Sequence, residues 1–204
     1  ACAKAGITEI MVVTGGPHAG NFLRVLKNGE DLGVTPLEYA YQEKEGGIAA
    51  ALGLCEAFAD AGPIAVILGD NTTDADISRP VRDFKDGAMV FLKQVTDPQR
   101  FGVAVFDPQD KTKIIRINEK PKQPQSDMAV TGLYIYDKKV FDYIRQCDPN
   151  YIGRGELEIT QVNNFYIQDK SMRWAKLEGF WSDAGTFDSL YHSNQYWAKK
   201  YLPQ

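Results

Sequence analysis

The sequence has few cysteines, little excess charge and no long apolar run, and each of these absences excludes a class of protein. Three cysteines, Cys2, Cys55 and Cys147, are odd in number and widely spaced among 204 residues. This argues against a disulfide framework or a zinc site and favours a reducing compartment. The net charge of −4 gives no electrostatic reason to bind nucleic acid. The longest apolar runs, such as Pro63 to Leu68, are far below the ~18–20 residues of a membrane span. No basic-then-apolar leader pattern opens the sequence. We expect a cytoplasmic protein with no membrane partner.

The composition and length predict one folded domain over residues 1–204. Hydrophobic residues make up 44% and charged residues 25%, close to the globular average, and no repeat or linker divides the chain. Strand-like and helix-like segments alternate, which is typical of an α/β fold with an open, mostly parallel sheet flanked by helices. We expect strands at 9–13, 37–41, 63–68, 88–95, 101–106, 113–118, 130–136 and 172–177, and helices at 22–26, 48–59, 139–146, 156–169 and 187–200.

Asp70 and Asp183 are the sharpest candidates for chemistry. Asp70 directly follows the apolar strand ending at Leu68, and ligands of open α/β sheets bind outside the carboxyl ends of strands. Its ordinary role would be a turn acid, and that of Asp183 would be a cap for the helix that follows. Two carboxylates from distant segments would instead hold one Mg²⁺ and leave positions open for phosphate oxygens.

Two further charged segments have both a structural and a functional interpretation. Lys120 follows Glu119 at the end of a strand, where a lysine is usually a solvated edge residue. In the functional interpretation Lys120 holds a phosphate and Glu119 accepts from a sugar hydroxyl. The acid-rich segment from Arg154 to Glu158 has the pattern of a helix start.

Other signals are weaker. The glycine-rich segment Gly15–Gly20 meets neither the dinucleotide-binding nor the P-loop pattern, so we interpret it as a turn. Asp74 and Asp76 have the D-x-D spacing of metal-using glycosyltransferases, which arises easily by chance. His18 and His192 have no acid or nucleophile at motif spacing, so a catalytic triad has no support.

Several of these segments together resemble the sugar-phosphate nucleotidyltransferases, and most closely their thymidylyltransferase branch. The order and spacing of the segments across nearly the whole chain carry the resemblance. They are Gln42 with Gly46–Ala50, Leu68–Asn71, Asp97–Val103, Glu119–Pro121, Ala129–Tyr134, Arg154–Thr160 and Trp181–Thr186.

The resemblance implies a fold of the nucleotide-diphospho-sugar transferase type and a homo-oligomer. It implies a nucleoside triphosphate, usually dTTP, and a sugar 1-phosphate such as glucose 1-phosphate as substrates. The products would be a nucleotide sugar and pyrophosphate, with Mg²⁺ as cofactor. No strong general base is needed, because an ionised phosphate attacks the α-phosphorus in line.

The resemblance also implies roles for individual residues. Asp70 and Asp183 resemble the Mg²⁺ ligands, and Lys120 resembles the contact to the sugar phosphate; these three are the expected catalytic residues. The residues expected to bind substrate are Gln42 and Gly47 at the base, and Gly102, Glu119, Gly132, Arg154 and Glu156 at the sugar.

The glycine-rich loop typical of this family, with its activating lysine, has no counterpart in the sequence. The resemblance therefore implies a domain that is incomplete at its N-terminus and lacks a first strand that is central in this fold. We expect the neighbours of that strand to have unpaired backbone groups, and the 204-residue chain to have little or no turnover.

Two other functions remain open. The chain would be a non-catalytic remnant or regulatory module that binds a sugar nucleotide, or a metal-dependent glycosyltransferase of related fold that uses Asp74 and Asp76.

Overall fold

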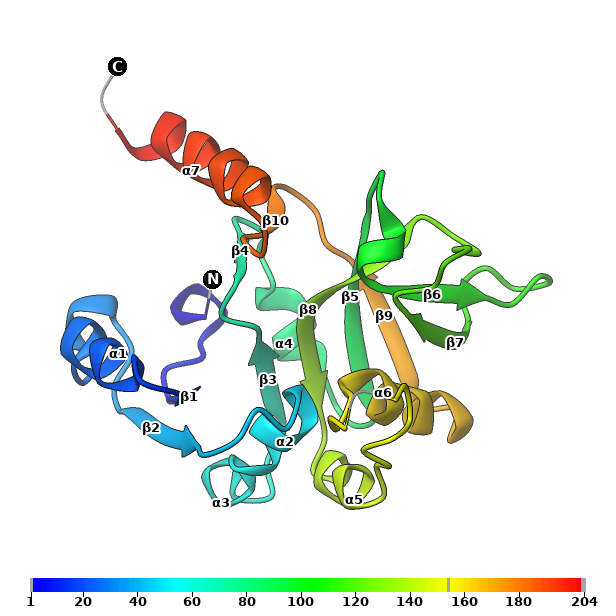
Figure 1. Ribbon diagram of the computed structural model, residues 1–204, viewed down its shortest axis with the longest axis horizontal. Helices are drawn as coiled ribbons and strands as arrows, with labels where there is room; N and C mark the ends of the chain where they lie inside the picture. The colour runs from blue at the N-terminus through cyan, green and yellow to red at the C-terminus, as the bar shows by residue number, and fades with distance from the viewer. Residues whose placement is uncertain (1, 154, 203–204) are drawn as a thin grey trace.

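The computed structural model describes residues 2–153 and 155–202, and a six-stranded sheet forms its centre (Figure 1). The sheet has the order β7-β6-β8-β5-β9, with β3 also paired to β8. Its strands are β3 (Ile64–Ile67), β5 (Ala88–Gln94), β6 (Gly102–Phe106), β7 (Ile114–Glu119), β8 (Met128–Tyr136) and β9 (Met172–Lys176). Strand β8 pairs with β5 along one edge, and with β6 and then β3 along the other.

Strand pairing is mixed rather than mostly parallel, which corrects the expectation from the sequence. Strand β9 is parallel to β5, whereas the pairs β3·β8, β5·β8, β6·β7 and β6·β8 are antiparallel. The reason lies in the connections: residues 107–113 join β6 to β7 as a short hairpin, and short links of this kind can connect only antiparallel strands. The expected α/β class, with a sheet flanked by helices, is confirmed.

Two small sheets lie beside the central one. Strands β1 (Ile10–Gly15) and β2 (Leu37–Gln42) form a parallel pair, and β4 (Asn71–Thr73) and β10 (Trp181–Asp183) form an antiparallel pair. Within the described residues, β1 pairs with β2 only and β3 pairs with β8 only. Each of these two strands therefore has one edge without a strand partner among the described residues.

Helices cover both faces of the central sheet. The larger core lies between the sheet and α2 (Ile48–Gly53), α5 (Lys139–Arg145) and α6 (Ile159–Gln168). Side chains of β8 alternate, so Tyr134 and Tyr136 enter this core, whereas Leu133 and Ile135 enter a second core near α4 (Ser78–Asp83). The other helices are α1 (Ala19–Leu26), α3 (Glu56–Ala59) and α7 (Phe187–Tyr201), with 3₁₀ turns at Ala3–Ala5, Glu30–Leu32 and Pro98–Arg100.

Two predicted helices differ from the structure. The predicted helix over 48–59 is divided into α2 and α3, and the helix predicted to start at 156 begins at Ile159. The second difference has a local cause: Leu157 bonds across to the loop before α2, with its N–H donating to Gly46 O (2.8 Å) and its carbonyl accepting from Ala49 N (3.1 Å). These bonds hold residues 156–158 in an extended loop.

Helix α7 lies at one end of the molecule and is held by contacts along its length (Figure 1). Thr186 and Ser189 form a capping box at its N-terminus. Asp74 contacts the helix through the Tyr196 hydroxyl and through Lys200 Nζ (2.7 Å). No helix in the described part of the chain is long and apolar enough to cross a membrane.

Candidate functional site

Asp70 and Asp183 are brought together by the small β4·β10 sheet. The register pairs Asp183 with Asn71, the residue after Asp70, and Ala184 N donates to Asp70 O (2.6 Å). Gly185 lies between the two carboxylates: a Cβ there would lie 3.2 Å from Asp183 Oδ2 and 3.7 Å from Asp70 Oδ2. Two acids that are far apart in the sequence thus border one small space.

The structure also tests the two structural roles considered for these acids, a helix cap for Asp183 and a turn acid for Asp70. Thr186 caps α7, so Asp183 does not serve as its N-cap. Asp70 Oδ1 accepts from the Asn71 side-chain amide (2.7 Å), which is a side-chain contact and not an Asx turn.

The acid pair fits Mg²⁺ in its chemistry. Mg²⁺ takes hard oxygen ligands and is usually held by one or two carboxylates together with water and substrate phosphates. Oxygens of Asp70 and Asp183 lie on the same side of Gly185, where a Cβ would make a tight contact with Asp183 Oδ2. Among the residues that the structure describes, no group of three or more His, Cys, Asp or Glu forms a metal site made of protein ligands alone.

Arg100 forms an ion pair with one of the two acids. Its guanidinium donates from Nη2 to Asp183 Oδ2 (2.6 Å) and from Nη1 to Asp97 Oδ2 (2.9 Å). The same group lies over the Phe101 ring at 5.0 Å from its centroid. The hydrogen bond to Asp97, with the charges of Asp183 and Asp97, raises the pKa of Arg100 above its ordinary value. A cation therefore already balances Asp183.

Apart from the space between the two acids, a second cavity, of about 370 Å³, is lined by residues from three segments of the chain. Five of the residues selected from the sequence border it: Gln42, Gly47, Glu119, Lys120 and Glu156. Glu45, Ile48, Ala51 and Glu158 complete its lining. Its charged lining is thus four carboxylates and one lysine.

Backbone geometry holds Gln42 and Gly47 in position at the side of this cavity where we expect the base to bind. Gln42 ends β2, and its amide donates to Gly47 O (3.4 Å). Gly47 has φ +88°, and a Cβ there would lie 2.6 Å from Leu157 O. Only glycine allows the loop before α2 to pack this closely against the loop before α6.

Glu119 and Gly102 face each other at the side where the sugar is expected. They are register partners in the β6·β7 pair, and a Cβ on Gly102 would lie 3.3 Å from Glu119 Oε2. The same oxygen accepts from Thr160 Oγ (2.6 Å), which orients the carboxylate. The next residue, Lys120, has φ +41°, is exposed, and donates its N–H to Phe101 O (3.0 Å).

Gly132 belongs to β8 of the central sheet and packs against the turn that carries Asp70. It has φ +66°, and a Cβ there would lie 2.9 Å from both Asn71 Nδ2 and Leu68 Cδ1. Nearby, Trp181 Nε1 donates to Asn71 Oδ1 (2.7 Å) and to Thr131 O (3.1 Å). Gly132 is buried beneath the Asp70 turn, so its place is against this turn and not in the lining of the second cavity.

A buried tyrosine connects the two regions electrostatically. Burial raises the pKa of Tyr134 well above its ordinary value, and the negative charges of Glu119, Asp70 and Glu158 raise it further. Asp70 of the acid pair and Glu119 of the cavity therefore act on the same side chain. Lys120 lines the cavity beside Glu119, and no contact joins its ammonium to Asp70 or Asp183 in the described part of the chain.

Three other residues were considered in the sequence analysis: Arg154, Asp74 and Asp76. Arg154 lies outside the described residues. Asp74 holds α7 and the Phe180 N–H (2.7 Å), and Asp76 bonds Lys4 and Ser78. The two acids of the D-x-D pattern thus have separate structural partners, which disfavours the glycosyltransferase alternative.

Sequence reasoning missed Arg100, Thr160 and Glu45. Arg100 and Thr160 lie within segments that had been selected, Asp97–Val103 and Arg154–Thr160, so their motifs were the available signal. Glu45 gave no signal, because an exposed acid in a loop is ordinary.

Comparison with known proteins gives a consistent result. The model of the nucleotidyl transferase family matches residues 1–200. A glucose-1-phosphate thymidylyltransferase of Neisseria gonorrhoeae is 39% identical over 195 residues, which cover 93% of this chain and 66% of that protein. The chain thus spans just under two thirds of the length of this relative.

Solved structures agree with the sequence matches. A crystal structure described as a glucose-1-phosphate thymidylyltransferase of Bacillus anthracis, in complex with a sucrose, superposes with a TM-score of 0.87 at 46% identity. The match covers 96% of this chain and 78% of that one. A UDP-glucose pyrophosphorylase with UDP-glucose bound has a TM-score of 0.82 at 20% identity over 98% of this chain and 84% of that one, which shows a shared fold.

Proposed function

Because the chain belongs to the nucleotidyl transferase family, we propose that it transfers a nucleotidyl group from a nucleoside triphosphate to a sugar 1-phosphate. We propose dTTP and glucose 1-phosphate as the substrates, since relatives named above carry the name glucose-1-phosphate thymidylyltransferase. One observation carries this proposal: five residues selected for base, sugar and phosphate contacts line one cavity of about 370 Å³.

The proposed reaction forms a bond between a phosphate oxygen of the sugar 1-phosphate and the α-phosphorus, and it breaks the bond from that phosphorus to pyrophosphate. The attacking oxygen is already ionised, so no residue has to remove a proton. The work of the protein is to align two anionic substrates and reduce their repulsion. In this proposal Lys120 neutralises the sugar phosphate, Glu119 accepts from a sugar hydroxyl, and Gln42 and Gly47 contact the base.

We further propose that Asp70 and Asp183 hold Mg²⁺, which would supply positive charge to the phosphates. The acids support this by facing one space beside Gly185. Arg100 then has to release Asp183, or share it, when the metal binds.

Titration calorimetry with glucose 1-phosphate and, separately, dTDP-glucose tests the substrate assignment. Lys120→Gln is expected to weaken glucose 1-phosphate binding about 10-fold or more, because a charge-assisted hydrogen bond contributes about 1.5–3 kcal/mol. Lys122→Gln is the matched control, since it removes the same charge two residues away, outside the cavity lining. Equal losses in the two variants would show general charge attraction and contradict the proposal.

A pyrophosphate-release assay separates catalysis from binding alone. Sugar-nucleotide binding with no pyrophosphate release, under conditions in which a longer relative is active, would favour a non-catalytic binding module.

The homo-oligomeric state and cytoplasmic location expected from the sequence stay predictions. Exposed apolar side chains on α7, among them Phe187 and Tyr191, are where we expect a contact between copies, and light scattering would detect it.

A further inference from the structure

The guanidinium of Arg100 binds the oxygen of Asp183 that lies nearest Gly185. Arg100 Nη2 lies 2.6 Å from Asp183 Oδ2, the same oxygen that a Cβ at position 185 would approach to 3.2 Å. A cation that binds this oxygen competes with Arg100 for it, because the two positive charges repel each other. Once another cation takes Asp183, Nη2 is left without this acceptor.

Two contacts still hold the guanidinium when Asp183 is taken. Arg100 Nη1 donates to Asp97 Oδ2 (2.9 Å), and the guanidinium carbon lies 5.0 Å from the centroid of the Phe101 ring. This ring packs edge-on against Trp181, with the centroids 5.4 Å apart. The side chain of Arg100 is 35% exposed, so a ligand can reach it from solvent. Loss of Asp183 thus makes Nη2 available to another anion while the rest of the side chain stays in place.

The turn that carries Arg100 also contacts the strand end that carries Lys120. This is the 3₁₀ turn Pro98–Arg100, and the next residue, Phe101, accepts at its carbonyl from Lys120 N (3.0 Å). Arg100 does not line the 370 Å³ cavity while it binds Asp183. Its turn is nevertheless bonded to the acid pair through the side chain and to the cavity lining through the backbone.

The charge of that cavity calls for a second cation. Among the described residues that line it, Lys120 is the one cation, beside four carboxylates: Glu45, Glu119, Glu156 and Glu158. A phosphate that binds beside Lys120 is repelled by these acids, so a further positive charge stabilises it. A guanidinium suits this role because its planar donors match two phosphate oxygens.

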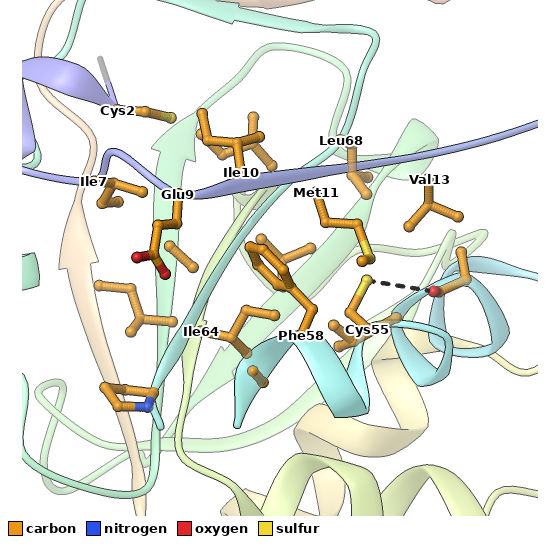
Figure 2. Close-up of a pocket in the computed structure, with 18 of the residues that line it drawn as sticks. Cys2, Ile7, Glu9, Ile10, Met11, Val13, Cys55, Phe58, Ile64 and Leu68 are labelled. Atoms are coloured by element: carbon orange, nitrogen blue, oxygen red, sulfur yellow. Dashed lines mark hydrogen bonds between the residues drawn. The ribbon is translucent and has the colours of Figure 1, made fainter. Parts of the chain in front are cut away.

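A larger cavity, of about 450 Å³ between β1 and β3, offers no such charge (Figure 2). Its one charged lining residue in the part of the chain that the structure describes is Glu9, which Figure 2 shows beside Ile7 and Ile10. The rest of its lining is apolar side chains, cysteine or glycine. Of the two cavities, only the one beside Lys120 has cations in its lining or in the adjoining turn.

We propose that Arg100 is a second phosphate-binding residue, whose guanidinium passes from Asp183 to the phosphate of the sugar 1-phosphate when Asp183 is taken. This rests on the proposed function, which supplies the sugar 1-phosphate, and it adds a residue to the single cation assigned there. With no ligand bound, Asp183 binds the guanidinium, so any change that weakens this contact strengthens binding of the sugar phosphate. A cation at Asp183 and the sugar phosphate therefore bind with positive cooperativity.

Asp183→Asn tests this exchange in the absence of metal ions, by titration calorimetry with glucose 1-phosphate in the presence of EDTA. Arg100 then has only a neutral partner at position 183, so we expect glucose 1-phosphate to bind roughly 5-fold or more tightly. In an Arg100→Gln background the same substitution should change the affinity by less than about 2-fold. Asp70→Asn is the matched control, because it removes the same charge from an acid that has no contact with Arg100 in the described part of the chain. Its gain should be smaller and the same with or without Arg100.

A second measurement applies if Asp183→Asn does not retain its thermal midpoint. Saturating Mg²⁺ should tighten glucose 1-phosphate binding at least about 3-fold more in the unsubstituted chain than in Arg100→Gln. An equal effect of Mg²⁺ in the two chains, or equal gains from Asp183→Asn and Asp70→Asn, would show general charge repulsion and overturn the proposal. The proposed function would survive either result if binding still depends on Lys120. Glucose 1-phosphate that binds none of these chains would overturn both.

Discussion

Removing the guanidinium of Arg100 is expected to increase the affinity of the acid pair for a divalent cation. Arg100 Nη2 lies 2.6 Å from Asp183 Oδ2, and the side chains are 35% and 17% exposed, so solvent screens this pair only in part. A charge-assisted hydrogen bond of this kind contributes about 1.5–3 kcal/mol. A cation that binds Asp183 competes with that contact and is repelled by the guanidinium. We expect Arg100→Gln to lower the Mg²⁺ or Mn²⁺ dissociation constant by about 1–2 kcal/mol, or roughly 5- to 30-fold.

The measurement is Mn²⁺ titration followed by electron paramagnetic resonance, with Mg²⁺ competition and no nucleotide present. Arg79→Gln is the control, because Arg79 contacts Asp83 at 3.4 Å on an 85% exposed side chain of α4. It should leave the affinity unchanged. Asp183→Asn should abolish Mn²⁺ binding in both backgrounds, so that the signal of the free ion is not reduced. An unchanged or weaker affinity in Arg100→Gln, with the thermal midpoint retained, would refute the reasoning.

Three other predictions concern stability and reactivity. Asp74→Asn should lower the free energy of unfolding by about 2 kcal/mol, because it weakens charge-assisted hydrogen bonds that hold α7. Urea unfolding followed by tryptophan fluorescence measures this loss. Hydrogen bonds to α7 lower the folded-state pKa of Asp74 to about 2 from 3.8, so its contribution is complete above pH 3.8 and disappears as the pH falls toward 2. Gly132→Ala should cost about 1–3 kcal/mol, because alanine would adopt φ +66° against atoms only 2.9 Å away. Burial raises the pKa of Cys147 to about 11, so its thiol should react with iodoacetamide far more slowly at pH 8 than at pH 10, read by mass spectrometry.

The two substitutions each have a matched control. Asp76→Asn, two residues from Asp74, removes an exposed acid paired with the exposed Lys4 and should change stability much less than Asp74→Asn does. Gly20→Ala in α1 meets no atom within 4 Å and should be neutral or stabilising. An equal loss in Asp74→Asn and Asp76→Asn, or a harmless Gly132→Ala, would contradict the structural argument.

Periodicity predicted most elements of the fold but not how the strands pair. Strands β3, β5 and β8 are apolar and β-branched, and their positions could be predicted within a few residues. Alternating helices and strands suggested parallel pairing, but the direction of β8 depends on long-range partners that no local pattern encodes. The three-residue strands β4 and β10 are too short to show a period, and they are what unites the acid pair.

The candidate site was predictable where a residue belongs to a motif. Gln42, Gly47, Glu119, Lys120 and Glu156 came from the resemblance, and the structure gathers them in one cavity. The pairing of Arg100 with Asp183 could not be predicted, because it depends on the side-chain reach between a 3₁₀ turn and β10. The sites of Mg²⁺ and of the substrates stay predictions.

The central position of β8 has a consequence for the order of events during synthesis. Strand β3 leaves the ribosome about 70 residues before β8, its strand partner, because Ile64 pairs with Tyr136. The aliphatic residues of β3 therefore stay exposed for seconds of translation, because pairing between strands so far apart in the sequence is slow. A nascent chain stalled before residue 128 should accordingly recruit holding chaperones at this stretch, and a chain released past residue 136 should lose them.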